Sequence, residues 1–196
     1  MFDSRKTRPD LQVCYLALVL LALSVSAFAQ DQDKDDDKDK KAEPVPKGYI
    51  KVEGKVRCGK PDPTYAIEVP DRPGHALTLN KRKCVWSEPL EIKGTKTKEG
   101  EAITFAEKME GELHVHGFEV DTLDNGEKLT WQSMGLITPD KGAAKVKGRW
   151  SLMRGTGNIK AIKGGGSYAG NVDADGVMTL NFDGVYDPNE IVEQKK

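Results

Sequence analysis

Three histidines are the residues of this 196-residue chain best suited to bind a metal ion. His114 and His116 lie two positions apart, so on a β-strand both side chains point to the same face. Two imidazoles on one face are a spacing that zinc sites use, and His75 is available as a third ligand. A partly exposed polar strand face is the simpler interpretation. We therefore assign no metal ion and expect no cofactor.

Other reactive patterns are incomplete. The stretch 171–176 resembles the start of an EF-hand loop, but Phe182 occupies the position where calcium binding needs a bidentate glutamate. No serine stands in a G-x-S-x-G motif. Glycine-rich residues 155–166 lack the Lys-Ser/Thr pair of a phosphate-binding loop. The sequence identifies no catalytic residue. It favours a protein that is not an enzyme but does not decide the question.

The cysteines predict one disulfide. Cys14 lies in an N-terminal segment that we expect to be removed, which leaves Cys58 and Cys84. A pair of cysteines in an exported protein most simply forms a bridge. Two free thiols or a metal-binding pair are the alternatives, although the spacing of these cysteines fits no zinc pattern.

Residues 1–29 have the features of a secretory signal peptide. A basic start is followed by an apolar run, and Ala27-Phe28-Ala29 is a small-x-small cleavage site. The run is shorter than the roughly 20 residues that cross a bilayer, so a retained anchor is the weaker alternative. We expect cleavage after Ala29, a periplasmic or extracellular protein, and no membrane-spanning segment after cleavage.

Residues 30–47 predict a disordered, charged linker, because they contain no aromatic residue and hardly any apolar one. Residues 189–196 are assigned as a C-terminal tail. The formal net charge of the chain is −1, with both signs interspersed. Such a charge distribution gives no electrostatic footprint for nucleic acid, which we do not expect as a partner.

Residues 48–188 have the length of a single domain, and turn signals recur between short alternating segments. Asp124-Asn125-Gly126 is the strongest hairpin signal among them. This pattern predicts an all-β fold, a single antiparallel β-barrel of about eight strands. The expected strands are 49–56, 66–69, 76–83, 90–97, 102–109, 111–122, 128–137, 144–153, 158–170 and 177–186.

The stretch 147–170 is the clearest part of the pattern. From Val146 to Met153, apolar residues and glycine alternate with polar or exposed positions, as in a half-buried strand. Gly155 and Gly157 flank Thr156 and permit positive φ angles at a turn. Three consecutive glycines, residues 164–166, indicate a bulge, a barrel corner or close approach of backbones.

The ribbon GRWSLMRGTGNIKAIKGGGSYAG resembles a motif of the allene oxide cyclase-like β-barrels. These are calycin-like, eight-stranded antiparallel barrels that include the dirigent proteins and many secreted bacterial proteins. The resemblance covers about 40 residues, 144–186, and involves turn residues rather than a catalytic set. It implies the fold, and it implies that such a barrel can steer cyclisation of a reactive apolar substrate by its shape.

Aromatic residues are the candidates for lining a cavity inside the barrel. An eight-stranded barrel can hold one small ligand, and aromatic walls suit apolar ones. We expect non-catalytic binding of a small apolar ligand or of an envelope partner. An isomerase or cyclase acting inside the barrel and a structural envelope protein with a packed interior are the alternatives. The candidate cavity residues are Trp131, Trp150, Phe118, Phe182 and Tyr186.

Overall fold

The computed structural model describes residues 44–109 and 111–189. The predicted signal peptide, most of the predicted linker and nearly all of the predicted tail lie outside these residues. The described residues belong to one compact unit. Within them, the chain forms β-strands and one short 3₁₀ helix: β1 (Ile50–Cys58), β2 (Thr64–Glu68), β3 (Ala76–Glu88), β4 (Glu91–Ile92), β5 (Thr95–Met109), β6 (Glu112–Leu123), β7 (Lys128–Asp140), β8 (Ala143–Gly155), η1 (Gly157–Ile159), β9 (Lys163–Val172) and β10 (Met178–Asp187).

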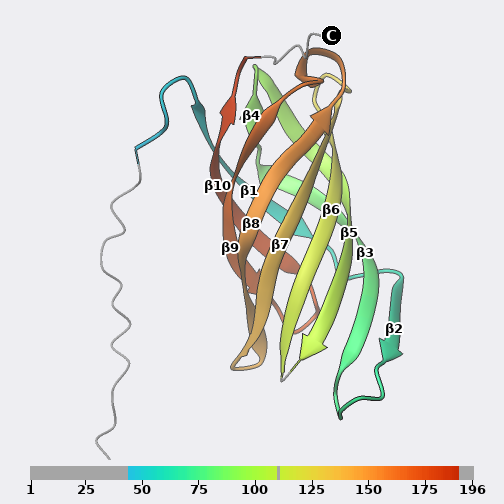
Figure 1. Ribbon diagram of the computed structural model, residues 1–196. Helices are drawn as coiled ribbons and strands as arrows, with labels where there is room; N and C mark the ends of the chain where they lie inside the picture. The colour runs from blue at the N-terminus through green and yellow to red at the C-terminus, as the bar shows by residue number, and fades with distance from the viewer. Residues whose placement is uncertain (1–43, 110, 190–196) are drawn as a thin grey trace, which may run out of the picture. The chain divides into compact units, whose positions relative to one another are not determined.

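The strands form a closed antiparallel barrel, which confirms the predicted fold class (Figure 1). The hydrogen-bonded order is β3-β1-β10-β9-β8-β7-β6-β5, and pairing of β3 with β5 closes the ring. In the described part of the chain, eight strands make this ring. β2 pairs with the first half of β3, beyond the point where β1 pairs with it, and β4 pairs with β5.

Alternation places side chains as expected along β8 and β10. Trp150 and Leu152 are buried in the interior, whereas Lys147 and Arg149 are exposed. On β10, Leu180, Phe182, Gly184 and Tyr186 are buried, and Asn181 and Asp183 are exposed. The inward-facing apolar residues of these two strands supply much of the core.

Glycines bring the backbones of β8, β9 and β10 close together around Trp150. The Trp150 indole N–H donates to the carbonyl oxygens of Ser167 and Asp183, each at 3.2 Å. A Cβ atom on Gly184 would lie 2.5 Å from the Trp150 ring, and one on Gly166 would lie 2.0 Å from the Asp183 oxygen. Close approach, one of the predicted meanings of this run, is therefore what the structure has.

Two predicted strands are wrong in part. The expected strand 90–97 contains a tight turn between β4 and β5, where Lys93 and Gly94 both adopt positive φ angles. The expected strand 158–170 begins as the helix η1 and becomes β9 only at Lys163. At the turn after β8, only Gly157 has a positive φ. Gly155 stays extended, and Ile159 fills the space beside it.

The Cys58–Cys84 disulfide is present, as predicted. The two cysteines are directly opposite each other on β1 and β3, with Cα atoms 3.9 Å apart. Both are buried in the interior of the barrel. The bridge therefore fastens the first strand of the ring to its neighbour β3.

Candidate functional site

Aromatic rings fill the middle of the barrel. The ring of Phe182 packs against Trp131 at 5.0 Å between centroids and against Trp86 at 5.3 Å. Tyr168 stacks on it at 5.5 Å, and Trp150 lies 6.1 Å away. These rings form one aromatic cluster, called the floor here because Trp131, Tyr168 and Phe182 of it line a cavity.

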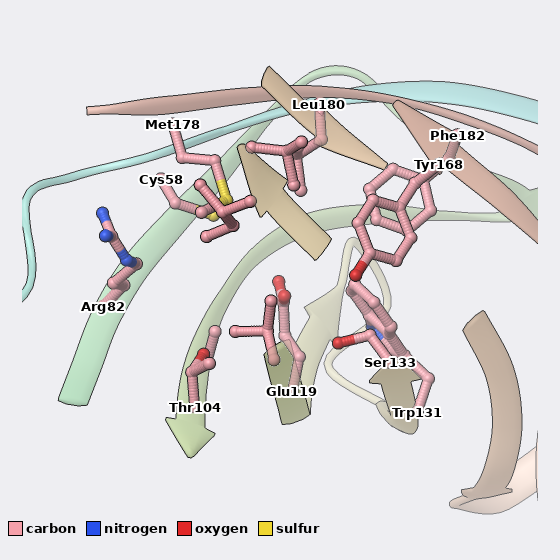
Figure 2. A pocket seen from close by; sticks show the side chains of 14 residues that line it. Cys58, Arg82, Thr104, Glu119, Trp131, Ser133, Tyr168, Met178, Leu180 and Phe182 are labelled. Atoms are coloured by element: carbon pink, nitrogen blue, oxygen red, sulfur yellow. The ribbon is translucent and has the colours of Figure 1, made fainter. Parts of the chain in front are cut away.

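A small cavity lies on one side of this floor, with a volume of about 50 Å³. Its walls are mainly apolar and come from β1, from β3 and from β5 through β10. The polar side chains in its lining are Arg82, Thr104, Glu119 and Ser133, and Figure 2 shows the Glu119 carboxyl pointing into the middle of this group. The apolar residues are Cys58, Ala102, Val115, Trp131, Ile137, Val146, Tyr168, Met178, Leu180 and Phe182.

Strand β6 brings two carboxyl groups into the interior. Glu119 and Asp121 are two positions apart and share the inward face, where both are buried. The space for them is left by Gly100 of β5, which pairs with Asp121. A Cβ atom on Gly100 would lie 2.1 Å from Asp121 Oδ1 and 3.1 Å from Glu119 Oε1.

Both oxygens of Asp121 have tryptophan partners. The Trp86 indole N–H donates to Oδ1 at 3.1 Å, and the Trp131 indole N–H donates to Oδ2 at 2.8 Å. Burial raises the pKa of Asp121, while the two indole donors oppose that rise because they stabilise the carboxylate. Asp121 thus acts as a structural acceptor that holds two indoles of the floor.

Glu119 is less well satisfied. Its Oε1 atom is buried and meets no donor group among the described residues, and the side-chain hydrogen bond between Glu119 and Asp121 requires a proton on one of the two carboxyl groups. Burial raises the pKa of Glu119 well above its ordinary value, and the charge of Asp121 and a side-chain hydrogen bond with Asp121 raise it further. Two buried carboxyl groups beside each other disfavour the charged form of both, so their presence next to a cavity calls for a functional explanation.

The disulfide lies beside Glu119. The two sulfur atoms and a Glu119 carboxylate oxygen all lie within 4.8 Å of one another. In the described part of the chain, no other group of three or more histidine, cysteine, aspartate or glutamate residues is close enough to hold a metal ion. Because both sulfurs are bonded to each other, neither offers the thiolate that a metal needs. The oxidised site therefore has a carboxyl group and an inert sulfur wall.

Arg82 closes one side of the cavity. Its guanidinium donates to the carbonyl oxygen of Gly59 at 2.8 Å and to that of Gly176 at 2.6 Å. These bonds join β3 to the chain after β1 and to the β9–β10 hairpin. These two backbone acceptors hold the Arg82 guanidinium at the side of the cavity.

The three histidines do not form a common site. His114 and His116 share the outer face of β6, as predicted, and both are exposed. His75 instead contacts Asp71 at 2.6 Å through Nδ1 and Glu107 at 2.9 Å through Nε2. The Asp71 and Glu107 carboxylates raise the pKa of His75, and this arrangement ties the loop before β3 to β5.

The structure separates the predicted cavity residues into three groups. Trp131 and Phe182 line the cavity. Trp150 and Tyr186 are buried in the core but do not line it. The inward placement of Phe118 was wrong, because this side chain is 50% exposed on the outer face of β6.

Glu119 and Asp121 are the site residues that sequence reasoning missed. Along 112–123, two glutamates, an aspartate and two histidines share the strand with apolar residues of both parities. The large apolar residue Phe118 favoured the wrong inward face. The signal that favoured the correct one was the pair of apolar residues Val115 and Leu123, which share the parity of the two acids.

No family model matches the chain, and no curated protein matches its sequence. Among the described residues, no helix is long and apolar enough to cross a membrane.

Proposed function

We propose that this protein binds a small, mainly apolar ligand inside its barrel, through a hydrogen bond to Glu119. The observation that carries the proposal is the buried Glu119 carboxyl group, whose Oε1 atom meets no donor, at the wall of a mainly apolar cavity. A ligand group at that position would satisfy the buried oxygen, and aromatic and aliphatic walls would cover the rest of the ligand.

The cavity volume limits the ligand. Pockets for drug-sized molecules enclose about 300–1,000 Å³, whereas this cavity measures about 50 Å³. One water needs about 10–15 Å³ on a comparable measure. The ligand is therefore a molecule of a few heavy atoms, or the narrow end of a longer molecule whose remainder extends toward the barrel mouth.

The state of Glu119 selects the polar group of the ligand. Because burial raises its pKa, Glu119 keeps its proton to a higher pH than an ordinary carboxyl group does. A protonated carboxyl can both donate and accept a hydrogen bond. We infer that the ligand presents a neutral carbonyl or hydroxyl group, and that Thr104 and Ser133 provide further hydroxyl contacts.

A second function is favoured by the coupling of the two carboxyl groups. A buried acid with a raised pKa beside a second carboxyl group is suited to donate and recover a proton in a reaction. In that case the barrel would be an isomerase- or cyclase-type enzyme, with Glu119 as its acid–base group. This alternative agrees with what the resemblance to allene oxide cyclase-like barrels implies.

We further propose that the protein is exported. The apolar N-terminal segment with its cleavage site and the Cys58–Cys84 bridge support this location. The mature chain would then begin at Gln30. N-terminal sequencing of the protein from the culture medium and from periplasmic and cytoplasmic fractions tests this proposal, and an intact Met1 on the folded protein contradicts it.

Ligand binding is tested with a series of small ketones from acetone to cyclohexanone. Trp131 lies in the cavity wall, so its fluorescence reports occupancy. We expect saturable quenching for the wild-type protein and binding at least about tenfold weaker for Glu119→Leu, since a hydrogen bond in a dry site contributes about 1.5 kcal/mol. Glu101→Leu on the exposed outer face of β5 is the matched control and should bind like the wild type.

Product analysis separates the two functions. Native mass spectrometry of the protein purified from its own host should detect a bound small molecule. If that molecule, once released and added back, is recovered unchanged, the protein is a binding protein. If it is converted to an isomer only when Glu119 is present, the protein is an enzyme and the second proposed function is correct. No quenching by any ketone, together with no bound mass, would contradict both.

A further inference from the structure

Arg82 is the one arginine of the described residues whose side chain is not on the exposed surface. It shares the inward face of β3 with Cys84 and Trp86, and it lines the cavity. Arginine is rarely buried unless a carboxylate pairs with it. Burial lowers the pKa of Arg82, and no carboxylate among the described residues pairs with it or opposes this effect. The cavity therefore contains a positive charge that the described chain leaves without a counter-ion.

The guanidinium of Arg82 has one edge free. Its Nη1 atom donates to the carbonyl oxygens of Gly59 and Gly176. The Nε and Nη2 atoms have no acceptor among the described residues. Parallel N–H groups of a guanidinium can each donate to one oxygen of the same carboxylate. Because the Nη1 bonds already fix the plane of the group, the free edge is held ready for such a pair of hydrogen bonds.

Strand register places Arg82 and Glu119 in one row across the interior. Arg82 of β3 is directly opposite Ala102 of β5, and Ala102 is directly opposite Glu119 of β6. Neighbouring strands are about 4.8 Å apart, so the backbones of Arg82 and Glu119 are separated by about 10 Å. The small side chain of Ala102 leaves space between them, and all three residues line the cavity (Figure 2).

We propose that Arg82 binds a carboxylate group of the ligand, and that the ligand is a short oxo- or hydroxycarboxylic acid. The carboxylate accepts hydrogen bonds from the free Arg82 edge, the neutral carbonyl or hydroxyl group meets Glu119, and the carbon chain between them lies over Ala102. This inference rests on the proposed function and names the class of its ligand. A dianionic phosphate fits less well, because Arg82 is the only basic residue in the lining that the described chain provides.

Oxo acids of increasing length test the inference: 4-oxopentanoate, 5-oxohexanoate and 6-oxoheptanoate, each compared with its methyl ester. The ester keeps the chain and the ketone but removes the charge. Quenching of Trp131 fluorescence reports binding. In the wild-type protein, we expect at least one acid to bind at least about tenfold more tightly than its ester, since hydrogen bonds between charged groups are the stronger ones. In Arg82→Met, the ratio of the two affinities should fall to about one.

The matched control is Arg149→Met, at an exposed position on the outer face of β8. It should keep the wild-type ratio. Because acid and ester are compared within each variant, a general loosening of the fold, which weakens both, does not imitate the expected result. Acids that bind no more tightly than their esters, or a preference that survives in Arg82→Met, overturn this inference and leave ketone binding at Glu119 intact. If no acid, ester or ketone binds, the inference and the proposed function both fail.

Discussion

The two sides of the barrel have opposite polarity. On β8, β9, β10 and β1 the interior is apolar and the outside carries residues such as Arg149 and Lys51. On β6 the arrangement is reversed, since Glu119 and Asp121 are buried and Phe118 and Val120 are exposed. Figure 1 shows these two sides of the ring, with β8 to β10 in orange to red and β3 to β6 in green to yellow.

This difference indicates that one side of the barrel mainly provides stability and the other side carries the features related to function. Exposed apolar patches and buried acids are the informative departures from the usual distribution of residues. The β8–β10 side has almost none of them and supplies tight packing through its glycines and Trp150. The β3–β7 side has both, and both of our functional proposals rest on it.

Breaking the tightly packed side should have the largest effect. In Gly166→Val, the new Cβ would lie 2.0 Å from a backbone oxygen and 2.5 Å from the Gly184 Cα, neither of which can move alone. We expect a loss of at least about 4 kcal/mol in the free energy of unfolding by urea, a size diagnostic of a severe packing fault. Ser167→Val, at the neighbouring exposed position, should change it by less than about 0.5 kcal/mol.

The disulfide joins the two sides where β1 meets β3, so its removal should loosen that seam. The double variant Cys58→Ala/Cys84→Ala should lose about 3 kcal/mol of unfolding free energy, because its unfolded chain is no longer closed into a loop. Thermal or urea unfolding measures the loss. Reduction of the wild type with dithiothreitol should reproduce it; an unchanged unfolding curve in both cases would contradict the role of the bridge.

Asp121 and Glu119 should respond differently to truncation. Asp121→Ala leaves the Trp86 and Trp131 indole N–H groups without their acceptor and should cost about 2–3 kcal/mol. Glu119→Leu replaces a poorly satisfied buried acid with an apolar group and should stabilise the fold by about 1 kcal/mol at neutral pH. Equal losses in the two variants would show that Glu119 has a structural partner and is not held for a ligand.

The pH dependence of stability should identify Glu119. Its pKa in the folded protein is raised above the ordinary value of 4.5, so the folded state holds a proton that the unfolded state releases. Unfolding free energy therefore falls as the pH rises from about 4.5 toward the raised pKa, with a slope of at most about 1.4 kcal/mol per unit. Urea unfolding of wild type and Glu119→Leu between these limits should show a steeper fall in the wild type, because the raised pKa values of Asp121 and His75 leave a smaller slope of the same sign in the variant. Parallel curves would contradict it.

The regular side was the more predictable from sequence. Val146 to Leu152 and Leu180 to Tyr186 alternate cleanly, so one parity identifies the core. The cysteine pair and the Asn125-Gly126 turn also fold as expected. Local signals suffice there because each residue type agrees with its position.

The reversed side resisted prediction for a physical reason. A hydrophobic pattern assigns Phe118 to the core, but the choice of face is made by the whole strand and by Gly100 across from Asp121. The indoles that satisfy Asp121 come from positions 35 and 10 residues away in the sequence. No local pattern contains that information.

Ketone titration of Glu119→Leu beside the wild type, with the unfolding free energy measured on the same samples, tests the central claim most directly. That claim is that the buried acid of β6 serves a ligand at the expense of stability. We predict a more stable protein that binds at least about tenfold more weakly. A less stable protein whose binding is unchanged would contradict the account.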